Sequence, residues 1–104
     1  MKYVIHKFQL PETTQRINLE ADAVVLYADR DSREDRVAIW VRRRCDWREQ
    51  PATVRTFRTV GTGEPYDVPV QQGEARPSEH GGGVTMYGPV RSGEFIFHVF
   101  EVKP

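Results

Sequence analysis

The chain has 104 residues with 15 basic and 15 acidic side chains, so its formal net charge is zero. This length builds one domain around a single core, and it excludes separate catalytic and regulatory modules within residues 1–104. The balanced charge excludes a protein that coats nucleic acid through general electrostatic attraction, because such proteins carry a clear positive excess.

The single cysteine and the hydrophobic pattern indicate where the protein is located. Cys45 alone cannot form an intramolecular disulfide or an all-cysteine zinc site, and this fits a reducing cytoplasm. No stretch approaches the roughly 20 apolar residues that a membrane helix needs, and residues 1–10 lack the apolar core of a targeting segment. The sequence therefore predicts a soluble, unprocessed protein without membrane contact.

The first half of the chain contains four stretches with the residue pattern of β-strands. Lys2–Gln9 alternates strictly, and Gln15–Leu19 alternates more briefly after a turn, so we expect the second stretch to pair back on the first. Ala23–Ala28 is apolar on both faces, which predicts a central strand. Arg36–Arg44 alternates again, and the polar run Asp29–Asp35 before it predicts an exposed hairpin loop.

The middle of the chain predicts a strand that ends in a glycine loop. Cys45–Gln50 is expected to join Arg36–Arg44 antiparallel to the next strand, which alternates from Val54 to Val60. Gly61–Pro65 follows directly, and two glycines close to a proline disfavour a helix there.

The last part predicts a hairpin that is preceded by a loop. Tyr66–Val70 fits a short extended piece or a single 3₁₀ turn, and Gln71–Gly83 is poor in apolar residues, which predicts a mobile loop. Val84–Val90 alternates, Ser92 and Gly93 form a tight turn, and Glu94–Val102 is expected to be the last strand, so the two stretches predict a C-terminal hairpin. Because the last stretch is apolar on both faces, we expect it in the interior of its sheet.

About seven short strands without any helical periodicity predict an all-β domain. The expected architecture is a small antiparallel β-sandwich or a partly open barrel of about seven strands. Apolar residues on both faces of Ala23–Ala28 and Phe95–Phe100 also leave open a sheet shared between subunits, and thus a homo-oligomer.

The glycine loop is the first candidate site. Gly61, Thr62 and Gly63 could bring backbone amides close to a phosphate, since glycine allows near approach and successive N–H groups bind anions. Arg58, on the preceding strand, could help the loop to hold an anion. The loop lacks the lysine of a P-loop and the third glycine and helix of a dinucleotide motif, so a purely structural turn is the favoured interpretation.

A run of three arginines is the second candidate site. Arg42 and Arg44 share one face of their strand, and with Trp47 they could bind an anionic ligand or an acidic partner surface. Arginine and aromatic residues are enriched at interface hot spots. The favoured alternative is a solvated strand end whose arginines pair with Asp46 and Glu49.

Neither the histidines nor the cysteine predicts a catalytic centre. His6, His80 and His98 show no metal-ligand spacing. His80 lies in the predicted mobile loop, and His6 and His98 on their strands are better explained as packed histidines bonded to backbone. Nothing in the sequence places a histidine or an orienting acid beside Cys45. We therefore expect no metal, no cofactor and no enzyme activity.

Two segments carry a family resemblance. Thr56–Gly63 spells TFRTVGTG and is followed closely by a proline, and Phe97–Glu101 spells FHVFE. In these segments the chain resembles a family of short, uncharacterised bacteriophage and prophage proteins, a domain of unknown function. It departs from the family in having Glu64 where a histidine or a similar residue is expected. The resemblance implies a phage origin and a location in the host bacterial cytoplasm, and it implies no catalytic residues.

Together these observations predict a phage-encoded, non-enzymatic binding protein. Its expected role is host takeover or anti-defence, with a host protein or a small anionic ligand such as a nucleotide as its partner. A virion component, either a decoration protein or a minor head or tail protein, is the first alternative. A nucleotide-processing enzyme that uses the glycine loop and nearby arginines is the last.

Overall fold

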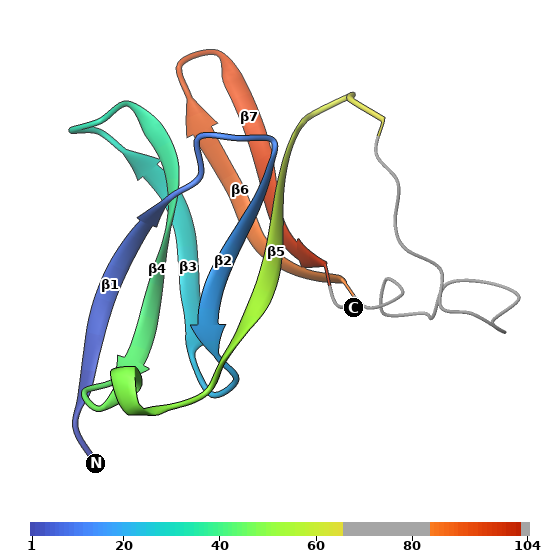
Figure 1. Ribbon diagram of the computed structural model, residues 1–104. Helices are drawn as coiled ribbons and strands as arrows, with labels where there is room; N and C mark the ends of the chain where they lie inside the picture. The colour runs from blue at the N-terminus through green and yellow to red at the C-terminus, as the bar shows by residue number, and fades with distance from the viewer. Residues whose placement is uncertain (66–83, 103–104) are drawn as a thin grey trace, which may run out of the picture.

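The computed structural model describes residues 1–65 and 84–102, and within them seven β-strands form two antiparallel sheets that face each other (Figure 1). The strands are β1 (Tyr3–Gln9), β2 (Thr14–Glu20), β3 (Val24–Asp31), β4 (Arg36–Arg44), β5 (Ala52–Gly61), β6 (Val84–Ser92) and β7 (Phe95–Val102), with a short 3₁₀ helix, η1 (Trp47–Glu49), before β5. The sheets do not close into a barrel in this part of the chain, so the predicted β-sandwich is confirmed. The predictions for Tyr66–Val70 and Gln71–Gly83 lie outside the described residues.

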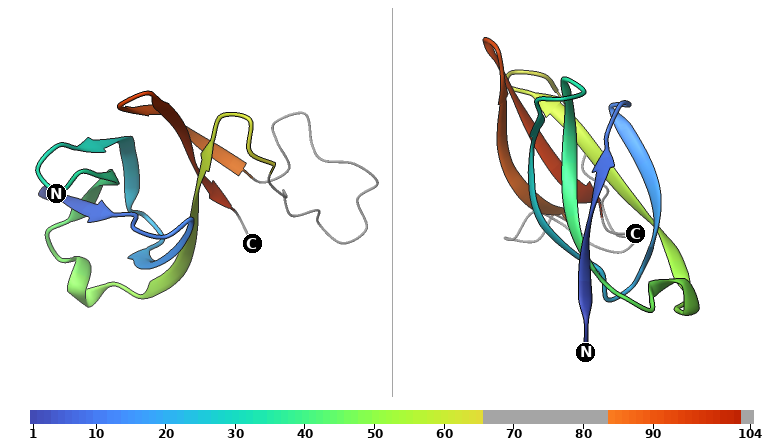
Figure 2. Two further views of the ribbon diagram at one scale, coloured as in Figure 1. Left: turned by 90° about the horizontal axis from the view of Figure 1, so that it is seen from above. Right: turned by 90° about the vertical axis from the view of Figure 1, so that its left-hand side faces the viewer.

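One sheet has three strands in the order β1-β4-β3, and the other has four in the order β2-β5-β7-β6. Figure 2 shows the two sheets from the end and from the side, with β1 at the front of the right-hand view. The predicted C-terminal hairpin is confirmed as β6 and β7. The last strand also lies in the interior of its sheet as expected, because β7 is paired on both sides.

The expected pairing of the first two strands is wrong, because they belong to different sheets. The amide of Leu10 still donates to the carbonyl of Val37 on β4, at 2.8 Å. The carbonyl of Thr13 already accepts from the amide of Thr59 on β5, at 2.9 Å. The short link between Leu10 and Thr13 thus carries the chain across the sandwich instead of closing a hairpin.

Two further sequence predictions are corrected. β3 lies at the edge of the three-stranded sheet, whereas Ala23–Ala28 was expected to be central, and a β-bulge interrupts it between Val25 and Tyr27. It also runs on to Asp31, which is buried, so only part of Asp29–Asp35 is a loop. The connection through η1 joins β4 to a strand of the other sheet rather than to an antiparallel neighbour.

The core fills the space between the sheets. The buried hydrophobic residues that pack together are Leu10, Leu19, Ala23, Val25, Ile39, Val41, Phe57, Val90 and Val99. Burying each large side chain of this kind contributes about 1.5–3 kcal/mol. The sandwich has two distinct ends: the η1 end, where β2, β4 and β7 finish, and the hairpin end, where the β6–β7 turn lies (Figure 1).

Candidate functional site

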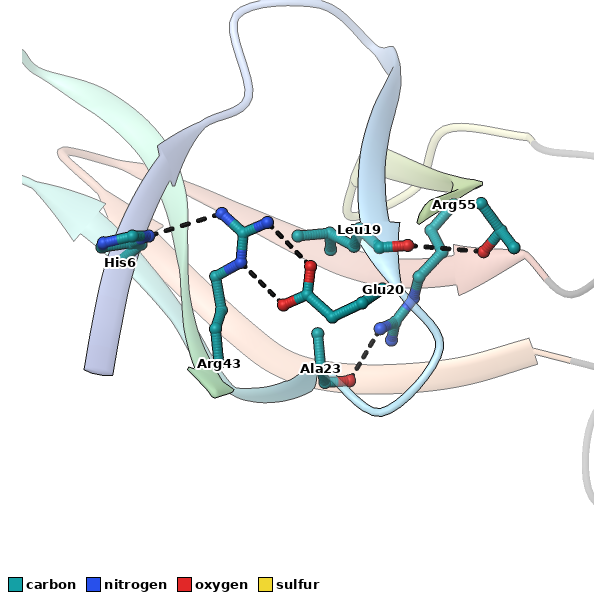
Figure 3. A network of polar contacts seen from close by, with 7 residues as sticks. His6, Leu19, Glu20, Ala23, Arg43 and Arg55 are labelled. Atoms are coloured by element: carbon teal, nitrogen blue, oxygen red, sulfur yellow. Dashed lines mark hydrogen bonds and ion pairs between the residues drawn. The ribbon is translucent and has the colours of Figure 1, made fainter. Parts of the chain in front are cut away.

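The three consecutive arginines at the end of β4 have three different environments. Arg43 lies in phase with the core-facing residues of β4 and is only 5% exposed. It donates from Nε and Nη2 to the two carboxylate oxygens of Glu20, both at 2.8 Å, and Glu20 is 2% exposed (Figure 3). Because Glu20 ends β2, this buried ion pair connects the three-stranded sheet to the four-stranded sheet at the η1 end.

Aromatic groups complete the surroundings of Arg43. Its guanidinium carbon lies 3.7 Å from the centroid of the Trp47 ring, and Nη1 lies 3.4 Å from Nδ1 of His6. The His6 and Trp47 rings meet edge to face, with centroids 5.8 Å apart. The hydrogen bond from Arg43 holds the pKa of Glu20 below its usual value. Trp47, a predicted site residue, therefore covers this ion pair from outside and contributes to the fold here.

Arg44 forms ion pairs at the surface. It donates from Nε and Nη2 to the carboxylate of Asp46, both at 2.8 Å, and its Nη1 lies 3.6 Å from a carboxylate oxygen of Asp22. The hydrogen bond to Asp46 raises the pKa of the Arg44 guanidinium. The pairing with Asp46 is the one anticipated for a solvated strand end, whereas Glu49 takes no part in it.

Arg42 lies on the outer face of the three-stranded sheet and forms no ion pair with any residue in ranges 1–65 and 84–102. Its guanidinium carbon is 4.7 Å from the centroid of the Tyr3 ring. It stands opposite Ile5 on β1 and Val24 on β3. Arg43 and Arg44 each bind a carboxylate, whereas Arg42 has none among the described residues and lies between exposed apolar side chains.

Aromatic residues extend this surface along the sheet. Tyr27 and Trp40 stack with ring centroids 5.0 Å apart and an interplanar angle of 15°. Tyr3, Ile5, Val24 and Tyr27 are all exposed. We define the aromatic face as Tyr3, Ile5, Val24, Tyr27, Trp40 and Arg42.

Two amide groups of the glycine loop already donate hydrogen bonds within the protein. The amide of Gly61 donates to the carboxylate of Glu64 at 3.2 Å, and the amide of Thr62 donates to the carbonyl of Ile96 at 3.0 Å. Gly63 has φ of 89°, which suits glycine and forms the turn. An incoming anion would have to displace the Glu64 carboxylate from the Gly61 amide.

A small cavity lies beside the glycine loop. It has a volume of about 240 Å³ and is lined by residues of the loop together with Met86, His98 and Phe100. The Thr62 hydroxyl lies 2.8 Å from Nε2 of His98. This cavity is smaller than the usual small-molecule site of about 300–1,000 Å³. A second cavity of about 410 Å³ borders the same loop, with Gly61, Thr62, Glu64, Phe95 and Ile96 among its lining residues.

Arg58 is separated from the arginines of β4. It is half-buried on β5, in the four-stranded sheet, where it stands opposite Thr14 and Phe100. Arg58 lies on β5, which ends at Gly61 where the glycine loop begins, whereas Arg42 and Arg44 lie on the other sheet. The seven predicted residues therefore fall into separate places and do not form one site.

A second buried network was missed by the sequence analysis. Arg55 donates to both carboxylate oxygens of Glu101, at 2.6 and 2.8 Å, and its Nη1 donates to the carbonyl of Ala23 at 2.7 Å. The Tyr87 hydroxyl donates to the same carboxylate at 2.8 Å. Burial, together with the hydrogen bond to Glu101, raises the pKa of Tyr87. This network links both neighbours of β7 to the turn before β3.

The described residues contain no group of three or more histidine, cysteine, aspartate or glutamate side chains placed to hold a metal ion. In the same residues, no helix has the length and apolar character to cross a membrane.

Comparison with known proteins gives one result. A family model described as a domain of unknown function, DUF7352, matches residues 1–104. No curated protein and no solved structure gives a match. The resemblance to a domain of unknown function is thereby confirmed, whereas phage origin stays a prediction. The chain belongs to the family of domains of unknown function DUF7352.

Proposed function

We propose that this protein is a phage-encoded, non-enzymatic accessory protein that binds one host protein in the bacterial cytoplasm through its aromatic face. The observation that carries this proposal is Arg42, a cation without a carboxylate among the described residues, set in an exposed surface of aromatic and aliphatic side chains.

The composition of this surface favours a protein as the partner. Tyrosine, tryptophan and arginine dominate binding energy at interfaces, because they bury a large area and keep polar groups that select the partner. Tyr27 and Trp40 are already stacked on each other, so little side-chain freedom is lost on binding. A partner carboxylate would complete the coordination of Arg42 in a bidentate arrangement.

A small anionic ligand is less well supported. In the glycine loop the Gly61 amide already donates to the Glu64 carboxylate, and the Thr62 amide already donates to the carbonyl of Ile96. None of the aromatic-face residues lines any of the four cavities of about 240–680 Å³ found among the described residues, and an open surface of this kind suits a protein better than a small molecule.

The test is affinity purification of the tagged protein from infected host cells with a matched pair of variants. Arg42→Glu reverses the charge in the aromatic face, and Arg16→Glu makes the same change at an exposed arginine on β2 of the other sheet. The expected result is one stoichiometric host protein with the wild type and with Arg16→Glu, and its loss with Arg42→Glu. Recovery only with assembled particles would overturn the proposal in favour of a virion component.

A further inference from the structure

Among residues 1–65 and 84–102, β1 has no paired strand on the side away from β4. The carbonyl of Lys2 accepts from the amide of Cys45 at 3.0 Å, and the amide of Leu10 donates to the carbonyl of Val37 at 2.8 Å. Even-numbered residues thus direct their backbone groups to β4. Because successive residues of a strand point their N–H and C=O groups to opposite sides, those of Tyr3, Ile5, Lys7 and Gln9 face away from β4. In the right-hand view of Figure 2, β1 lies at the front.

The other three edges are protected in ways that β1 is not. β3 carries a bulge between Val25 and Tyr27, and β6 is irregular between Met86 and Pro89, where proline offers no amide. β2 exposes only polar side chains at alternate positions, including Arg16 and Asn18. Bulges, proline and charge are the usual devices that prevent edge pairing.

The polar side chains of β1 are turned inward and leave its edge open. The Nζ of Lys7 and the Nε2 of Gln9 both lie 2.7 Å from the same carboxylate oxygen of Asp31, which belongs to β3. To reach it, both cross the small residue Ala38 on β4. Lys7 is thus held over the sheet and does not extend from the edge, where a lysine would oppose pairing. Tyr3 and Ile5 remain, 52% and 57% exposed.

We propose that β1 pairs antiparallel with β1 of a second copy of this chain, about a two-fold axis at Ile5. In this register Ile5 stands opposite the partner subunit's Ile5, and Tyr3 stands opposite the partner subunit's Lys7. The outward backbone groups of Tyr3, Ile5 and Lys7 then meet their equivalents in hydrogen-bonded pairs. The two three-stranded sheets become one sheet of six strands, with both aromatic faces on the same side.

The side chains favour a second copy as the occupant of this edge. A two-fold axis makes the interface self-complementary, and the Ile5 register places an apolar residue on itself and an aromatic ring beside a lysine stem. An axis at Lys7 would instead oppose two ammonium groups, which disfavours that register. The dimer forms without the proposed host partner, since it uses the backbone edge of β1. Of the aromatic face it uses only Tyr3 and Ile5, and it leaves Val24, Tyr27, Trp40 and Arg42 accessible to a partner.

Analytical ultracentrifugation of the full chain over a wide concentration range tests this proposal. The wild type is expected to reach twice the monomer mass of 12.0 kDa. Ile5→Lys, which places two like charges across the axis, is expected to remain a monomer. Val54→Lys is the matched control, because Val54 is 56% exposed on the other sheet, and it is expected to dimerise like the wild type. A monomeric wild type at all concentrations, or a dimeric Ile5→Lys, would overturn the proposal.

Amide hydrogen exchange tests the register independently of any variant. In the dimer the amides of Tyr3, Ile5 and Lys7 become protected as concentration rises, whereas those of His6 and Phe8 are protected by β4 at every concentration. A wild-type dimer in which the Ile5 amide exchanges as fast as in the monomer would show that the chains associate elsewhere.

Discussion

The two ends of the sandwich differ in how they are closed. At the η1 end, the Arg43–Glu20 pair joins the two sheets and is covered by Trp47. At the hairpin end, an open groove of about 680 Å³ remains between the sheets, with Leu10, Val37 and Phe97 among its lining residues. The difference teaches that a buried ion pair fixes how the sheets meet at one end. At the other end, hydrogen bonds such as those from the amide of Thr59 to the carbonyl of Thr13 and from the amide of Thr62 to the carbonyl of Ile96 hold the connecting segments.

A buried ion pair of this kind specifies an arrangement more than it adds stability. Removing two charges from water costs several kcal/mol, and their attraction roughly offsets that cost when the geometry is good. The bidentate geometry of Arg43 and Glu20 meets this condition. The comparison between the two ends can therefore be tested by removing one partner, because a single unpaired charge is expensive whereas the loss of both is not.

The largest expected effect is that of Arg43→Ala. This change leaves Glu20 buried without its partner, and we expect it to lower the free energy of unfolding by about 3–5 kcal/mol. Arg44→Ala, next to it in the chain, removes a surface pair and is expected to cost at most about 1 kcal/mol. Urea denaturation of both variants measures the difference.

The double variant Arg43→Met/Glu20→Met sharpens the same comparison. It replaces the pair with apolar side chains, and we expect it to be more stable than Arg43→Ala. If the double variant and Arg43→Ala unfold at the same urea concentration, the unpaired carboxylate is not the source of the loss.

A smaller effect is expected from Tyr87→Phe, which removes one donor to the Glu101 carboxylate. The expected cost is about 1 kcal/mol, or a fall in Tm of about 4–8 °C. Because the pKa of Tyr87 is raised in the folded protein, its contribution is complete below the unfolded value, about pH 10, and falls as the pH rises above it. The Tm difference between wild type and Tyr87→Phe should therefore narrow above that pH. A difference that widens there would contradict the assignment.

The smallest effect is expected at the hairpin end, from Glu64→Ala. Glu64 is exposed and its carboxylate accepts one amide bond, so we expect a cost within about 0.5 kcal/mol. The variant also frees the Gly61 amide. Differential scanning fluorimetry with inorganic phosphate and nucleotides should show no rise in Tm for the wild type. A rise in the wild type that Arg58→Ala removes would restore the glycine loop as a ligand site.

The fold class could be predicted from the sequence, but the pairing of strands could not. Alternation along β1 and β2 shows which side chains share a face, and it carries no information about the neighbouring strand. Val24 and Tyr27 illustrate a second limit. An apolar residue on an exposed face has the same sequence pattern as one inside a sheet, so β3 was expected at the centre although it lies at an edge.

One partner of the Arg43–Glu20 ion pair could have been predicted from the sequence, and the other could not. Arg43 lies in phase with Val37, Ile39 and Val41 on β4, and an arginine at the end of a core-facing row is a signal for a buried partner. No sequence signal identifies Glu20 as buried, because it lies in phase with exposed residues of β2. The pair forms only because two strands of different sheets end at the same place, and no local pattern records that.

The early crossing of the chain between the sheets has a consequence for folding during synthesis. All three strands of the first sheet lie within residues 3–44, so this sheet can pair before the rest of the chain is made. β2 lies between them in sequence, yet its partner β5 begins only at Ala52. During synthesis β2 therefore has no strand to pair with until β5 has been made, whereas β1, β3 and β4 already have their partners. Such long-range pairing is typical of β-sandwiches that fold in milliseconds to seconds.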